Sequence, residues 1–229
     1  CNVTITNPEK KSISAIYLYQ ESNLFIKNNS VVNVSGFTGN RCSGIYADDS
    51  EYTPDKGDMP NRDIQVTGGS TLTITNCGWH GMTVNPIDML IDDHSVIDIS
   101  NCGNSQYGGG LGCYYGKLTI KNGSALNTND NRGSSWGTFV KELKMDSTST
   151  LSSCRNTGDG IDIGGEGIIP AGANVTLDEN KGHGLVSYAG SNYWFGDVQI
   201  SAGAKVSIRN NTRGILVIEN AVLDINTST

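Results

Sequence analysis

The chain has 229 residues, of which 29 are glycine and only 5 are proline, and it carries a formal net charge of -7 at pH 7. This acidic balance argues against a nucleic-acid surface, because binding to phosphates requires clustered Lys and Arg side chains. No apolar run is long enough to cross a bilayer, no signal peptide is visible and helical periodicity is nearly absent. We therefore expect an all-β chain without membrane insertion.

A short motif recurs along the chain: two apolar residues two apart, a break, Ser or Ala, and two more apolar residues two apart. The Ser or Ala taken as the anchor of each copy is, in chain order, Ser30, Ser70, Ser95, Ser124, Ser149, Ala173 and Ala204. Successive anchors are 40, 25, 29, 25, 24 and 31 residues apart, so the base period is 24 to 25 residues. Such self-similarity is typical of repeat architectures.

Each copy predicts three short strands. The first apolar pair stands six and four residues before the anchor, the second two and four residues after it, and a third pair follows a glycine. In the copy around Ser70 these pairs are Ile64 and Val66, Leu72 and Ile74, and Gly81-Met82. Gly167 breaks the pattern of the first pair, whereas the small residues Thr128 and Ser153 remain candidates to face inward.

Alternation with a period of two gives each strand one apolar face, and three such strands can bury these faces only by stacking on neighbouring copies. The sequence therefore predicts a single domain over residues 1–229, a right-handed parallel β-helix (β-solenoid) of about seven coils with three short strands per coil. Because Thr229 interrupts a copy and neither end carries a capping helix, we expect a region excised from a longer surface protein.

The six cysteines show no C-x-x-C spacing, so we do not expect them to bind zinc. Cys77 and Cys102 both stand seven residues after their anchors, which would make them vertical neighbours close enough for a disulfide. Cys42 falls near the same corner. Two interpretations stay open: an oxidised, secreted protein, or small buried side chains that fill a column.

The residues just before the third-strand glycines should form a surface column that includes Asp159, His183 and Arg213. The segment 156–163, Asn-Thr-Gly-Asp-Gly-Ile-Asp-Ile, and the later Gly-His-Gly around His183 resemble fragments of the polygalacturonase family of β-helix glycosidases. The family's intermediate Asp-Asp pair and its Arg-Ile-Lys motif are missing. The resemblance implies acid-base chemistry by Asp159, Asp162 and His183, with Arg213 steadying a uronate carboxylate.

Two long insertions, residues 46–63 and 187–197, follow third strands, and insertions on one side of a solenoid often form its binding face. Exposed aromatic rings beside polar groups suit sugar ligands. The candidate ligand-binding residues are Tyr46, Tyr114, Tyr115, Phe139, Asp159, His183, Tyr188, Tyr193, Trp194, Phe195 and Arg213. The first insertion is acidic, and its candidate Ca²⁺ ligands are Asp48, Asp49, Asp55 and Asp58, although a solvated loop is the competing interpretation. No other cofactor is expected.

The repeat as a whole resembles the pectate-lyase-like superfamily, and within it the large bacterial surface adhesins that use this coil without the enzymes' active site. The resemblance implies a secreted or cell-surface adhesin that binds a glycan or a host surface protein through the third-strand face and the two loops. One alternative is a polysaccharide lyase or glycoside hydrolase acting on pectin-like or mucin-like glycans. Another is a passive stalk that spaces other domains.

Overall fold

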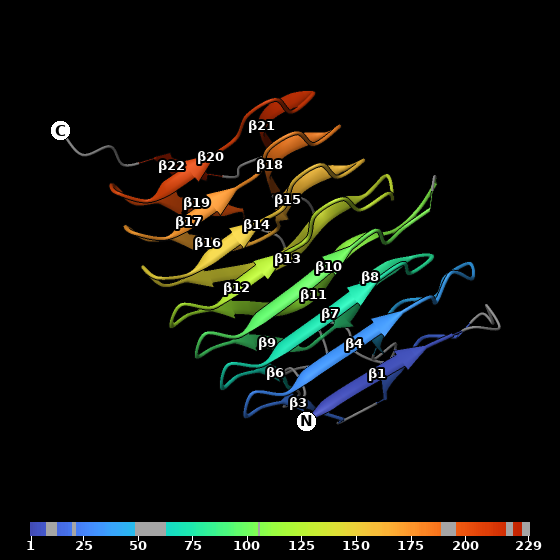
Figure 1. Cartoon of the computed structure of the whole chain (residues 1–229). Coiled ribbons are helices and arrows are strands. Elements are labelled where there is room, and N and C mark those ends of the chain that lie inside the picture. The colour runs from blue at the N-terminus through green and yellow to red at the C-terminus, as the bar shows by residue number, and fades with distance from the viewer. Residues whose placement is uncertain are drawn as a thin grey trace, which may run out of the picture.

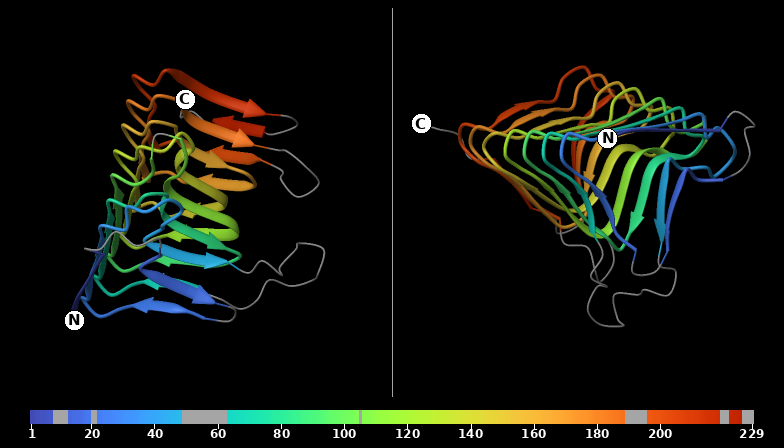
Figure 2. Two further views of the ribbon diagram at one scale, coloured as in Figure 1. Left: turned by 90° about the vertical axis from the view of Figure 1, so that its right-hand side faces the viewer. Right: turned by 60° about the horizontal axis from the view of Figure 1, so that its bottom comes forward.

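The computed structural model describes residues 1–7, 13–19, 22–48, 63–104, 106–188, 196–218 and 222–225. Within these residues the structure consists of strands and turns without a helix, and the strands pair in parallel in two sheets. Figure 1 shows the strands stacked one above the next from the N-terminal to the C-terminal end, and Figure 2 shows the same winding from two other sides. The predicted all-β, parallel, solenoid-like class is confirmed.

One sheet collects the strands that follow the anchors. Its eight strands lie in the order β1 (Asn2–Thr6), β4 (Val31–Ser35), β7 (Thr71–Thr75), β10 (Val96–Ser100), β12 (Ala125–Asn127), β14 (Thr150–Ser152), β17 (Asn174–Thr176) and β20 (Lys205–Ser207). The register places equivalent residues of successive copies side by side, for example Leu72 beside Ile97 and Leu126 beside Leu151. The predicted alignment of the copies is therefore present in this sheet.

The other sheet has 14 strands and contains both the third and the first strands of the copies. The third strands are β2 (Ile16–Tyr19), β5 (Ile45–Asp48), β8 (His80–Asn85), β11 (Gly109–Ile120), β13 (Trp136–Met145), β15 (Asp159–Ile163), β18 (His183–Tyr188) and β21 (Arg213–Ile218). The first strands are β3 (Leu24–Ile26), β6 (Asp63–Val66), β9 (Asp88–Ile91), β16 (Glu166–Ile169), β19 (Asp197–Ile200) and β22 (Val222–Ile225).

β11 and β13 differ from the predicted short strands, because each continues from a third strand into the following first strand. In β11 the pairing with β13 shifts register between Cys113 and Lys117, and Tyr115 in this interval has a φ of 57°. A bulge of this kind bends a strand without ending it. The strand therefore turns a corner of the coil while most of its pairing is kept.

The core lies between the sheets and consists of the inward residues of every strand, including Leu72, Ile74 and Ile97, which are fully buried. Thr128 and Ser153 are also fully buried, as predicted, and the Thr128 hydroxyl lies 2.9 Å from the Ser153 hydroxyl. Gly167, which breaks the apolar pattern, leaves space that Ile163 fills from the preceding strand, since a Cβ there would lie 3.1 Å from the Ile163 Cδ1.

The serine anchors hydrogen-bond to one another along the stack. The backbone N–H of Ser30 donates to Ser70 Oγ over 3.1 Å, and that of Ser70 donates to Ser95 Oγ over 3.0 Å. The N–H of Ser95 continues the series to Ser124 Oγ over 3.1 Å. Since a buried N–H without an acceptor is destabilising, the hydroxyl gives a physical reason for serine at this position.

A second buried column, seven residues after the anchors, consists of asparagines: Asn131, Asn156, Asn180 and Asn211. The Oδ1 atom of Asn156 accepts from the backbone N–H of Asn131 at 3.0 Å and from its Nδ2 at 3.2 Å. The N–H of Asn156 donates in turn to Asn180 Oδ1 at 2.9 Å. Each asparagine therefore satisfies the backbone of the preceding copy.

The asparagine column is one reason for the glycines that open the third strands in the C-terminal half of the stack. A Cβ on Gly160 would lie 2.8 Å from Asn180 Nδ2, and one on Gly184 would lie 2.8 Å from Asn211 Nδ2. The Gly184 carbonyl oxygen lies closer still to the Cβ on Gly160, at 2.5 Å, so a side chain there would meet both the asparagine and the neighbouring backbone. The glycine and the asparagine of adjacent copies thus occupy one shared space.

Replacing Asn156 by alanine should lower the free energy of unfolding by at least about 2 kcal/mol, because the buried N–H of Asn131 loses its acceptor. The matched control is Asn174→Ala, an exposed asparagine on β17, which should change stability by less than about 0.5 kcal/mol. Urea unfolding followed by circular dichroism measures both. Equal losses in the two variants would contradict a special role for the column.

The cysteines carry reduced thiols, and all but Cys1 are buried. Cys102 precedes the asparagines in their column, since its N–H donates to Asn131 Oδ1 at 3.1 Å. A hydrogen bond with the neighbouring Cys102 thiol, together with burial, raises the pKa of Cys77 well above its ordinary value. Of the two interpretations left open by the sequence, the structure therefore has the one in which cysteines fill a buried column.

A thiol-specific reagent at pH 8 should modify Cys1 alone in the native protein, one thiol of the six, because the other five thiols are buried and inaccessible to the reagent. In guanidinium chloride all six should react. Absorbance of the released chromophore gives the count. Rapid modification of a second thiol in the native state would contradict the burial described above.

Candidate functional site

Aromatic rings line the outward face of the third strands at the N-terminal end of the stack. The rings of Tyr17 and Tyr46 stack with their centroids 5.4 Å apart, and those of Tyr46 and Trp79 lie 6.5 Å apart. His80 follows at 4.9 Å from Trp79. The side chain of Tyr17 is 58% exposed, so the series begins in solvent.

The series continues across the middle of the stack. His80 stacks on Trp136 at 5.9 Å, Trp136 contacts Phe139 at 5.0 Å, and Phe139 contacts Tyr114 at 5.1 Å. We call Tyr17, Tyr46, Trp79, His80, Trp136, Phe139 and Tyr114 the aromatic row. Its members come from successive copies and contact one another because the copies stack in register. Tyr17 is exposed, His80 is buried at 4% exposure, and the other rings are half-buried.

The ring of Tyr114 folds back over Gly112 of the same strand. A Cβ on Gly112 would lie 3.0 Å from the Tyr114 Cε2, so the glycine leaves room for the ring. The position of Gly112 is in register with Phe139, which the Tyr114 ring contacts. Burial, followed by the negative charge of Asp162, raises the pKa of Tyr114 to about 12. The tyrosine therefore keeps its proton and can donate a hydrogen bond at neutral pH.

Carboxylates lie directly beside the row. Asp159 is in register with Trp136, and Asp162 is in register with Phe139, so the two aspartates continue the same face one strand further. Asp159 Oδ1 accepts from the backbone N–H of His183 and lies 3.0 Å from its Nδ1. The predicted column is therefore present at Asp159 and His183.

Arg213 is in register with His183 and has an exposed side chain. Arg213 therefore occupies the position in the predicted column that follows His183. Arg213 is the first residue of β21, the last third strand, which lies at the C-terminal end of the stack in Figure 1.

Asp162 is the most perturbed carboxyl on this face. Burial, and then repulsion by Asp159, raise its pKa well above the usual range. Within the described part of the chain, its Oδ1 atom and the Nε1 atom of Trp136 are buried without a hydrogen-bond partner. A carboxyl that retains its proton can donate it to a ligand, and a neighbouring carboxylate that accepts hydrogen bonds can take a proton up.

Several predicted site residues lie outside the described part of the chain. These are Tyr193, Trp194 and Phe195 of the second insertion and Asp49, Asp55 and Asp58 of the first. For Asp48 and Tyr188 the structure gives the backbone alone. No cluster of three or more His, Cys, Asp or Glu side chains suited to a metal ion occurs in the described ranges. The Ca²⁺ site stays a prediction.

Sequence reasoning missed part of the aromatic row. Tyr17, Trp79, His80 and Trp136 are not among the predicted ligand-binding residues. A usable signal was present, because His80 and Trp136 occupy the same position before a third-strand glycine as Asp159. Tyr115, a predicted ligand-binding residue, lies at the bulge with a φ of 57° and is half-buried, as Tyr114 is.

Comparisons with known proteins give no relative to which the site can be compared: no protein-family model matches the chain, and neither the curated proteins nor the solved structures contain a significant match.

In the described ranges, no helix has the length and apolar character needed to span a membrane.

The raised pKa of Asp162 makes stability depend on pH. Because the folded state binds this proton more tightly than the unfolded chain, the contribution of Asp162 is complete below about pH 4 and is lost as pH rises toward the folded pKa. Asp162→Asn should therefore be more stable than the parent at pH 8 by about 1 kcal/mol or more, and similar to it at pH 4.

Urea unfolding at both pH values measures this difference. The matched control is Asp130→Asn, which neutralises a carboxylate that accepts two hydrogen bonds from Arg155 and should reduce stability at pH 8 instead. An unchanged slope of stability against pH in Asp162→Asn would show that the buried carboxyl does not titrate as described.

Proposed function

We propose that this chain is a binding region of a secreted or cell-surface bacterial protein and that it recognises a glycan through the aromatic row. Sugar rings present apolar C–H faces that pack on aromatic rings, while their hydroxyls bond to carboxylates and amides. The continuous contact of rings from Tyr17 to Tyr114 supports this proposal most strongly, because an isolated exposed ring needs no functional explanation.

The same row bears on the choice between a glycan and a protein ligand. Several rings are half-buried and held by their neighbours, so they need little ordering when a ligand binds. Asp159, His183 and Tyr114 add polar groups at one end of the row. Flat rings with polar groups at their edge favour a sugar chain, and a host surface protein is the alternative partner.

Two finer features of the fold belong to this proposal. We take the winding to be right-handed with about seven coils, as the spacing of the anchors indicates. A relationship to the pectate-lyase-like superfamily, by fold, remains part of the proposal and is supported by the parallel in-register stacking.

A second candidate function is cleavage of a polysaccharide. It is favoured by one observation: Asp162 has a raised pKa while Asp159 accepts hydrogen bonds from His183, which is the division of roles that an acid and a base require. In that case Asp162 would donate the proton, Asp159 would accept one and Arg213 would hold a uronate carboxylate.

Binding measured on a glycan array and then by calorimetry should weaken at least about tenfold in Tyr17→Ala and in Trp79→Ala, because each removes a stacking ring. The matched control is Phe25→Ala, an equally exposed aromatic (51%) on β3, away from the row. It should bind as the parent does. Equal losses in all three variants, or no binding to any glycan, would contradict the proposal, and the latter result would favour a passive stalk.

The same preparations decide between binding and cleavage. If pectin or mucin glycans incubated with the protein release products, and Asp159→Asn abolishes the release, polysaccharide cleavage replaces glycan binding as the proposed function. If glycans bind without any product, the binding function stands.

A further inference from the structure

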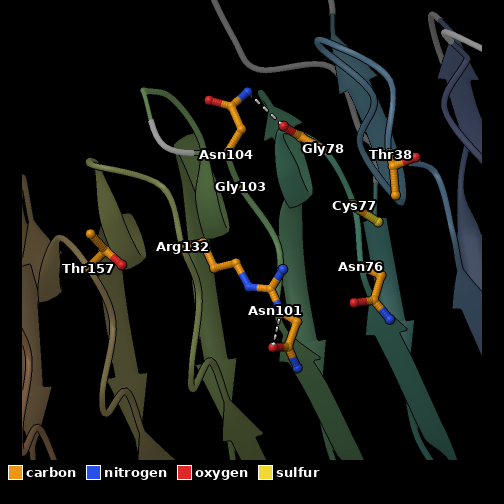
Figure 3. A pocket seen from close by; sticks show the side chains of 9 residues that line it. All are labelled: Thr38, Asn76, Cys77, Gly78, Asn101, Gly103, Asn104, Arg132 and Thr157. Carbon is orange, nitrogen blue, oxygen red and sulfur yellow. Dashed lines mark hydrogen bonds between the residues drawn. The ribbon is translucent and has the colours of Figure 1, made fainter.

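A shallow groove crosses the turns between the eight-stranded sheet and the third strands. It consists of two adjoining hollows of about 570 and about 710 Å³, and Asn104 lines both of them. Figure 3 shows the first hollow, with the Arg132 side chain extending along it toward Asn101. Trp79 lines the second hollow and also belongs to the aromatic row, so the groove and the row meet at one indole ring.

Asn104 fixes the wall of the groove. Its Oδ1 accepts from the backbone N–H groups of Gln106 and Tyr107, both at 2.9 Å, and its Nδ2 donates to the carbonyl of Gly78 at 3.0 Å in the neighbouring copy (Figure 3). Ser134 Oγ donates to the carbonyl of Gln106 at 2.6 Å. The backbone that carries Tyr107 is thereby tied to copies on both sides.

Tyr107 is the most exposed large aromatic on this wall, at 65%. An exposed ring on a fixed backbone loses little freedom when a ligand stacks on it. Trp79 and Tyr107 therefore give the second hollow two aromatic rings, and the same hollow is lined by the amide side chains of Asn104 and Gln106.

The charges of the groove are opposite to those of the whole chain. Among the described residues that line the two hollows, Arg41 and Arg132 are the charged ones and neither hollow contains a carboxylate, although the net charge of the chain is -7. Arg41 has no ion pair or hydrogen bond of its side chain within the described ranges. Arg132 donates from Nη2 to Asn101 Oδ1 at 3.0 Å, and its guanidinium has further N–H donors.

We infer that this groove is a second binding site, which takes a sulfate or carboxylate group carried by a glycan whose sugar rings stack on Trp79 and Tyr107. A guanidinium fork matches the paired oxygens of either anion, so Arg41 and Arg132 select charged glycans over neutral ones. The inference rests on the proposed function in one respect, because Trp79 serves both the groove and the aromatic row.

Calorimetry with two matched pairs of probes tests this site. Hyaluronan oligosaccharides and their carboxyl-reduced form isolate the carboxylate, and sulfated and unsulfated dextran oligosaccharides isolate the sulfate. At one ionic strength the parent protein should bind at least one charged probe about tenfold or more tightly than its neutral partner. The pair that shows the difference identifies the anion.

Arg41→Gln and Arg132→Gln should each remove most of this preference while leaving the affinity for neutral probes unchanged. Arg41→Lys should restore part of it, because a lysine keeps the charge but lacks the fork. The matched control is Lys205→Gln, an exposed cation on β20, which makes the same change in net charge away from the groove. It should leave the preference intact.

The inference is overturned if the parent shows no preference in either pair, or if Lys205→Gln lowers the preference as much as Arg41→Gln. Tyr17→Ala separates this result from the proposed function, since Tyr17 lies in the row and not in the groove. If Tyr17→Ala weakens binding of every probe while the arginine variants change nothing, the groove site fails and the aromatic row stands. If Tyr17→Ala is silent and Arg41→Gln removes binding of charged probes, the groove stands and the row fails.

Discussion

Hydrogen bonds that run from a buried side chain to the backbone of the next copy are the interaction on which the rest of this structure depends. Apolar stacking opposes a shift by one residue, which would turn the apolar side chains outward, but a shift by two residues keeps the same face inward. The Ser70 hydroxyl and the Asn156 amide, by contrast, each accept one particular backbone N–H from the preceding copy. A shift by two residues would leave these donors buried without acceptors, at a loss of about 1 to 3 kcal/mol for each.

Fixed register is what turns the outer surface into a site. Trp136 and Asp159 are neighbours because their strands pair in register, although 23 residues of sequence separate them. The same holds for Asn104 and Gly78, which the groove wall joins across 26 residues. Outward side chains meet no packing requirement of their own, so the scaffold can carry aromatic rings on one face and arginines at the adjoining turns without disturbing the core. Two binding surfaces that meet at Trp79 are compatible with a single uninterrupted core.

How far the sequence predicts this structure depends on which constraint acts on a residue. Inward positions are predictable, because alternation with a period of two must be satisfied in every copy, and even Thr128 and Ser153 were placed correctly. The asparagine column was not predicted, since Asn156 and Asn180 look like ordinary turn residues until the hydrogen bonds to the next copy are visible. Trp79 and the groove residues were missed for the opposite reason: no repeated pattern marks an outward side chain, and only the folded arrangement brings it beside its partners.

The shared space of the third-strand glycine and the asparagine of the following copy has a consequence for how such a chain can change over evolutionary time. A side chain at Gly160 would meet the Gly184 carbonyl oxygen at 2.5 Å as well as Asn180 Nδ2 at 2.8 Å, so the glycine and the asparagine must be kept together. Losing or gaining a complete winding keeps every such pair matched, whereas an insertion inside the core does not. Duplication and deletion of entire units is thus the easiest path by which a relative of this protein becomes longer or shorter, with irregular additions confined to the loops outside.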